Sequence, residues 1–161
     1  MNRIITILNI GLQIALTFIA TFFIYMFFAL LDSDFGIDGI FGLLFFHPII
    51  GILLSSITII VCLIIGLPIR LNNKINNWWI NNSYISIVGI LIGLAFLIFS
   101  ILPQYKETVN ICKGETLAVK QIPNKILSYI GWILTSFSIL HTYPPKKLIE
   151  KLNLFLKSKL R

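Results

Sequence analysis

Four stretches of this chain contain no Asp, Glu, Lys or Arg and are about as long as a helix that crosses a bilayer. Such a helix needs roughly 20 mostly apolar residues to span a hydrocarbon core about 30 Å thick. The stretches are continuously apolar rather than alternating, which disfavours transmembrane β-strands. The pattern predicts an all-α integral membrane protein, a bundle of four transmembrane helices at about residues 4–31, 48–67, 84–102 and 126–143.

The composition agrees with a membrane location. Of the 161 residues, 57% are hydrophobic and only 12% are charged, whereas an ordinary soluble domain is about 25% charged. The first stretch is too long for the 7–15 residue apolar core of a signal peptide, so we expect a retained span. Residues 1–143 are predicted to form a single domain. The abundance of Ile, Asn, Lys and Phe indicates an AT-rich genome, such as a bacterial one.

The distribution of Lys and Arg between the loops predicts the orientation. The loop Asp32–His47 carries three acids and no Lys or Arg, the loop 68–82 carries Arg70 and Lys74 and no acid, and the segment after Tyr143 is strongly basic. The positive-inside rule then places both termini in the cytoplasm of a multi-pass protein of the plasma (inner) membrane. The loop between the third and fourth spans does not fit this orientation, because it carries four Lys and would lie outside the cytoplasm.

Each predicted span has one face of small or polar residues. Lipid tails are as apolar as Leu, so helices associate in a membrane by close packing and hydrogen bonds. We expect these faces to meet inside the bundle; the alternatives are that one of them lines a water-filled path or contacts another subunit. The predicted packing residues are Asn9, Gln13, Thr17, Gly51, Ser55, Cys62, Gly66, Gly89, Gly93, Gly131 and Thr135.

Residues 144–161 predict a cytoplasmic, basic, amphipathic helix that lies on the membrane surface. Docking to a cytoplasmic partner is the alternative. The net charge of +7 lies mostly in this tail and fits a lipid surface better than nucleic acid. The residues predicted to contact the lipid surface are Trp78, Trp79, Lys146, Lys147, Lys151 and Lys157.

The loop between the third and fourth spans predicts a small extracytoplasmic β-hairpin. Apolar and polar residues alternate on both sides of Gly114. A three-residue turn at Lys113–Glu115 would set Ile111 opposite Leu117 and Val109 opposite Val119.

Candidate chemistry is sparse. Asp32, Asp34 and Asp38 could gather a cation or pair with His47, but their spacing matches no calcium loop. We expect His47 and His141 to lie at opposite ends of the protein and at its interfaces. No catalytic residue, metal site or cofactor is predicted.

Three functions are consistent with this pattern. The first is a non-enzymatic interaction, anchor or accessory subunit that acts through helix packing within the membrane, with a membrane protein or further copies of itself as the partner. The second is an oligomeric pore or a membrane-disrupting effector. The third is a small transporter or enzyme that uses His47 with the loop acids.

Overall fold

The computed structural model describes residues 2–32, 37–113 and 116–143, and within these ranges it leaves out the side chains of residues 2–6, 37–38 and 110–118. The protein is mostly helical, with three long apolar helices, a shorter apolar helix and a two-stranded antiparallel hairpin. The predicted tail helix 144–161 and its Lys146, Lys147, Lys151 and Lys157 lie outside the described residues.

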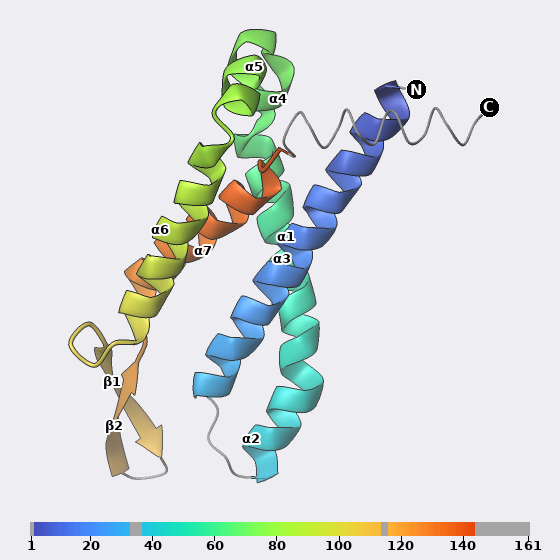
Figure 1. Ribbon diagram of the computed structural model, residues 1–161. Helices are drawn as coiled ribbons and strands as arrows, with labels where there is room; N and C mark the ends of the chain where they lie inside the picture. Colours follow the sequence, from blue (N-terminus) through green and yellow to red (C-terminus); the bar gives the residue numbers. More distant parts are fainter. Residues whose placement is uncertain (1, 33–36, 114–115, 144–161) are drawn as a thin grey trace.

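The two N-terminal segments form long helices that pack side by side (Figure 1). Helix α1 runs over Asn2–Asp32, and α2 (Ile37–Phe41), the π-helix η1 (Gly42–Phe46) and α3 (His47–Ile65) follow one another without a break. Gly51 of α3 lies under Tyr25 and Phe22 of α1. A Cβ atom at Gly51 would come within 2.8 Å of a Tyr25 ring carbon, so glycine allows this approach.

The predicted loop Asp32–His47 is therefore wrong from Ile37 onward, where the chain is helical. Its residues are apolar enough to extend the span, and a helix satisfies their backbone groups internally. Pro48 explains the π-helix. A proline cannot donate a hydrogen bond and crowds the carbonyl four residues earlier, and here the backbone N–H of His47 reaches back five residues to the carbonyl of Gly42.

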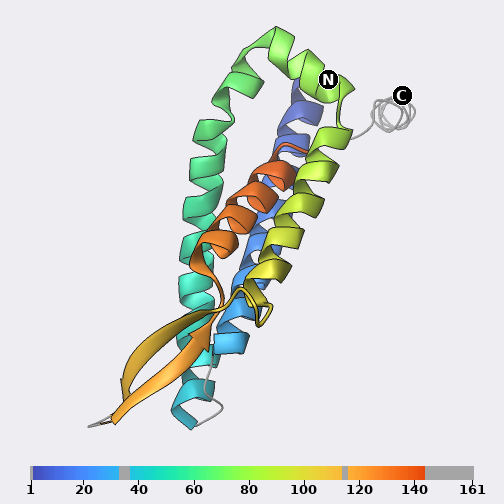
Figure 2. The same ribbon diagram turned by 90° about the vertical axis from the view of Figure 1, so that its left-hand side faces the viewer.

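The segment expected to be a surface loop forms two short helices, α4 (Leu67–Leu71) and α5 (Asn73–Asn81). Asn72 caps the start of α5: its side-chain oxygen accepts hydrogen bonds from the N–H groups of Lys74 and Ile75, as an N-cap residue does. Together α4 and α5 arch from α3 to α6 (Figure 2).

Helices α6 (Tyr84–Ile101) and α7 (Lys125–Leu140) form the closest pair in the protein. Their contact depends on glycine: a Cβ atom at Gly131 would lie 2.7 Å from the Gly93 carbonyl oxygen and 2.9 Å from the Leu97 nitrogen. Helix α7 also packs against α1 and α3, so it connects α6 to the pair formed by α1 and α3.

The predicted hairpin is present as β1 (Glu107–Lys113) and β2 (Thr116–Ile122), but the predicted register is wrong by one residue. Ile111 pairs with Ala118 and Val109 with Lys120, so two residues rather than three separate the paired ends, and two-residue connections are the commonest in hairpins. A shift of one residue moves side chains to the opposite face. Val119 accordingly does not share a face with Val109 and is 69% exposed.

The distribution of side chains is that of a membrane protein. The buried side chains include many Ser and Thr residues and Gln13, whereas the outward faces of α1, α3 and α6 consist mostly of large apolar residues. In water these outward faces would drive aggregation, but in lipid they need no cover. Residues 7–32, 39–65 and 84–101 are each long and apolar enough to span a bilayer. The chain is therefore a small polytopic membrane protein in contact with lipid.

Candidate functional site at the C-terminal end of α7

The chemically richest part of the described structure lies where α7 ends. Helix α7 has 16 residues, which corresponds to a length of about 24 Å, shorter than a hydrocarbon core of about 30 Å. In Figure 1 its C-terminal end lies beneath the α4–α5 arch. The last carbonyl groups of any helix lack partners within the helix, and in an apolar medium each unpaired carbonyl is costly. The end of α7 therefore needs hydrogen-bond donors from other parts of the chain.

Side chains from four helices supply these donors. The Leu140 carbonyl accepts from an Nη2 atom of Arg70 at 3.2 Å, and the Thr142 carbonyl accepts from Nε2 of Gln13 at 2.6 Å. The His141 carbonyl accepts from Nε1 of Trp79 at 2.8 Å and from the hydroxyl of Ser86 at 3.0 Å. We call these residues the α7 end cluster: Gln13, Arg70, Trp79, Ser86 and His141.

Gln13 and Arg70 are also joined to each other. The Arg70 Nη2 atom donates to the side-chain oxygen of Gln13 at 3.1 Å, so the buried Gln13 uses both ends of its amide. The guanidinium cation lies at a helix C-terminus, where the helix dipole places partial negative charge. This arrangement stabilises a positive charge that has no carboxylate partner among the described residues.

The His141 ring is fully buried within the protein. Its Nδ1 atom lies 2.9 Å from the Phe137 carbonyl, which can only accept, so Nδ1 carries the proton. The ring stacks on Phe137 at a centroid distance of 4.3 Å and meets Trp79 edge-on. It lies against Gly66, where a Cβ atom would overlap it. Glycine at position 66 therefore makes room for the histidine.

Two polar atoms of this cluster, Arg70 Nε and His141 Nε2, are buried and without a hydrogen-bond partner in the described structure. Ser55 and Thr135 also bury unpaired hydroxyl groups deeper in the bundle. Most of the other buried hydroxyls donate to a carbonyl of their own helix, as Thr17 does to Gln13 and Thr21 to Thr17.

The other predicted packing residues lie as follows. Thr17, Gly51, Ser55, Cys62, Gly66, Gly93, Gly131 and Thr135 are buried, while Gly89 and Asn9 are partly exposed. Gly89 lies against the Ser138 side chain. Asn9 makes no side-chain hydrogen bond within the described part of the chain. Trp78 is 54% exposed, whereas Trp79, its neighbour, is turned inward onto the α7 end cluster.

Of the predicted acid–histidine group at the opposite end, the structure describes the side chains of His47 and Asp32, which have separate partners. His47 bonds through Nδ1 to the Tyr25 hydroxyl at 2.9 Å, and Asp32 forms an ion pair with Lys120 of the hairpin at 2.7 Å. Asp34 lies outside the described residues, as does the side chain of Asp38 in α2. Among the described side chains, no group of three His, Cys, Asp or Glu residues could hold a metal ion.

Sequence reasoning missed Arg70 and His141 as members of one cluster. The available signal was the shortness of the fourth apolar stretch, which requires donors for its last carbonyls. Pairing those carbonyls with Arg70, 70 residues earlier than Leu140, depends on the α4–α5 arch, and the Asn-rich segment gave no indication of two helices.

The Trp pair provides a matched test of the cluster. We expect Trp79→Phe to lower the free energy of unfolding by about 1 kcal/mol, because one buried hydrogen bond to the His141 carbonyl is lost. Trp78→Phe removes the same indole group from an exposed position and should change stability by less than about 0.5 kcal/mol. Unfolding of the two purified variants by a denaturing detergent compares them, and equal losses would show that the Trp79 bond is unimportant.

Comparisons of the chain with protein-family models, with curated proteins and with solved structures found no match.

Proposed function

We propose that this protein is a non-enzymatic, four-span membrane protein that acts through contacts with a partner inside the bilayer, as an interaction, anchor or accessory subunit. In this proposal α7 is the fourth span and both termini are cytoplasmic. The closure of the α7 end by side chains of α1, α4, α5 and α6 carries the proposal. It joins the helices into one unit whose polar groups face one another and leaves apolar outward faces for contacts.

The α6–α7 contact gives further support and disfavours a pore within one chain. Gly93 and Gly131 bring the two backbones together so closely that neither position has room for a methyl group. A water-filled path between α6 and α7 would need separated polar walls, whereas backbone and side-chain atoms fill the contact at Gly93 and Gly131. An oligomeric pore would need a polar outward face, and the outward faces of α1, α3 and α6 are apolar. Release of dye from liposomes at high protein load would favour the pore over our proposal.

The transporter or enzyme alternative gains no support from His47 and Asp32. His47 is bonded to Tyr25, and the carboxylate of Asp32 is bonded to Lys120, so these two residues do not pair with each other.

Site-specific photo-cross-linking in cells tests the proposed function. A photoreactive amino acid is placed at Leu12 of α1, Ile57 of α3 or Ile87 of α6, all of which are 56% exposed. Thr135, only 1% exposed, is the buried control. We expect at least one outward position to capture a single membrane protein or a second copy of this chain, and the control to capture neither. Lipid adducts alone at all three outward positions would overturn the proposal.

The proposed orientation makes a separate prediction. Cys112 lies in β1 at the hairpin end, and Cys62 is buried in α3. A membrane-impermeant maleimide added to intact cells should label the protein through Cys112, and labelling should disappear in Cys112→Ser but persist in Cys62→Ser. Labelling only after the cells are permeabilised would reverse the orientation.

A further inference from the structure

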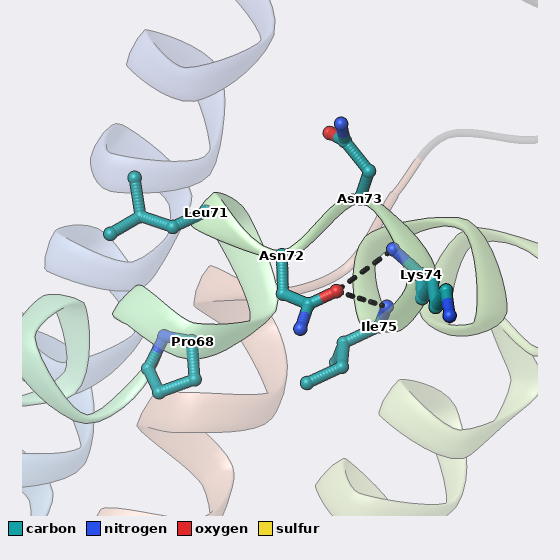
Figure 3. A pocket seen from close by; sticks show the side chains of 6 residues that line it. All are labelled: Pro68, Leu71, Asn72, Asn73, Lys74 and Ile75. Carbon is teal, nitrogen blue, oxygen red and sulfur yellow. Dashed lines mark hydrogen bonds between the residues drawn. The ribbon is translucent and has the colours of Figure 1, made fainter.

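The bend between α4 and α5 forms an open pocket of about 700 Å³ (Figure 3). Its lining is half apolar and half polar: Pro68, Leu71, Ile75, Asn72, Asn73 and Lys74. Leu71 is 76% exposed, so the apolar part of the lining is open rather than filled by the protein itself. A pocket with this lining fits an amphiphile better than a simple ion.

The polar part of the pocket offers donors. The side-chain oxygen of Asn72 is turned toward the N–H groups of Lys74 and Ile75, and its amide nitrogen points between Pro68 and Ile75 (Figure 3). The start of α5 is thus already capped and contributes nothing further. Figure 3 shows the Asn73 amide pointing away from Asn72, so the remaining donors are the Asn72 amide and the exposed Lys74 ammonium group. The complementary ligand therefore carries acceptor oxygens and negative charge.

The charge around Lys74 and the position of the α4–α5 arch at the membrane surface indicate which class of ligand fits the pocket. The chain has no Asp or Glu between residues 39 and 106, so nothing acidic in this long segment opposes an anion at Lys74. Helix α5 also carries the exposed Trp78, a residue type that favours the headgroup level of a bilayer. The α4–α5 arch caps the ends of α3 and α6, where lipid headgroups lie when these helices span the membrane (Figure 2).

We propose that this pocket binds one anionic phospholipid. The phosphate is held by the Lys74 ammonium group, and the glycerol and upper acyl chain lie on Pro68, Leu71 and Ile75. An interfacial Lys contributes about 1 kcal/mol to anionic lipid binding. The site is distinct from the α7 end cluster and does not depend on the proposed partner.

Native mass spectrometry of the full chain in mild detergent tests the proposal with added phosphatidylglycerol or phosphatidylcholine. We expect the first phosphatidylglycerol to bind more tightly than phosphatidylcholine, and Lys74→Gln to weaken that first binding step about fivefold. Lys125→Gln is the matched control, because it removes an exposed Lys at the start of α7, far from the pocket. It should leave the first binding step unchanged.

The apolar part of the pocket lining is tested by Leu71→Asn, which should weaken phosphatidylglycerol binding although Lys74 is retained. Equal affinity for the two lipids, or equal losses in Lys74→Gln and Lys125→Gln, would overturn the proposal. Displacement of the lipid by millimolar inorganic phosphate would also overturn it, because it would show that phosphate alone is recognised. A mass spectrum that shows an acidic protein bound to the chain, and no bound lipid, would identify the pocket as a protein-binding site instead.

Discussion

Replacement of Gly131 by alanine should destabilise the protein by about 1–3 kcal/mol, the usual cost of an overpacked interior. The added methyl group would lie 2.7 Å from the Gly93 carbonyl oxygen and 2.9 Å from the Leu97 nitrogen. Both are backbone atoms, so no side chain can rotate away, and α6 and α7 must separate. The free energy of unfolding, measured by titration of the purified protein with a denaturing detergent, records the effect.

Gly11→Ala is the matched control on α1. Nothing lies within 4 Å of a Cβ atom at this outward position, and alanine favours a helix over glycine by about 1 kcal/mol. We expect this variant to be as stable as the original chain or more so. If Gly131→Ala proved as stable as Gly11→Ala, the close α6–α7 contact would be refuted.

Gln13→Leu should cost about 1–3 kcal/mol, the penalty for leaving a buried polar group unpaired. Leucine fills similar space but cannot donate to the Thr142 carbonyl or accept from Arg70. Among the described residues, the Thr142 carbonyl then has no donor and Arg70 keeps only the Leu140 carbonyl as an acceptor. Thermal unfolding in mild detergent should show a lower midpoint for this variant.

Asn9→Leu serves as the control, one helical turn earlier on the same face. Asn9 is partly exposed and makes no side-chain hydrogen bond to the described residues. Its replacement should be neutral or stabilising in a membrane-like medium, because an unpaired amide is removed. A loss as large as that of Gln13→Leu would mean that the polarity of α1, rather than its bonds to α7, maintains the structure.

Much of the helical architecture follows from the sequence because charge-free length is a strong signal. The bounds of α6, Tyr84–Ile101, lie within one residue of the predicted 84–102. The second apolar helix starts at Ile37 rather than at residue 48. The acids before residue 48 suggested a loop, but a five-residue π-helix accommodates Pro48 within a continuous helix. Such a local change in hydrogen bonding has no simple sequence signature.

The α7 end cluster was only partly predictable. The cost of exposing Gln13 to lipid indicated an inward position, but not its two partners. Arg70 was assigned to a surface loop by its charge, and His141 to the interface by its place at the end of an apolar stretch. Both assignments treated the residues singly, whereas the cluster arises because a short helix presents three unpaired carbonyls to α1, α4, α5 and α6.

For the hairpin, too, the sequence indicated the elements but not their partners. Alternation of apolar residues indicated two strands, and both are present. The register depends on whether two or three residues make the turn, and that choice also fixes how the hairpin attaches to the helices. Lys120 reaches Asp32 at the end of α1, and Glu107 accepts from the Lys125 N–H at the start of α7.

The closure of α7 by other helices is tested most directly by a double-mutant cycle on Gln13→Leu and Arg70→Gln. The two side chains are in direct contact and donate to different carbonyls at the end of α7, those of Thr142 and Leu140. We predict a coupling free energy of about 0.5–3 kcal/mol between the substitutions, as is typical of residues in one hydrogen-bond network. Losses that add to within about 0.3 kcal/mol would contradict this structure, because additivity is the behaviour of independent sites.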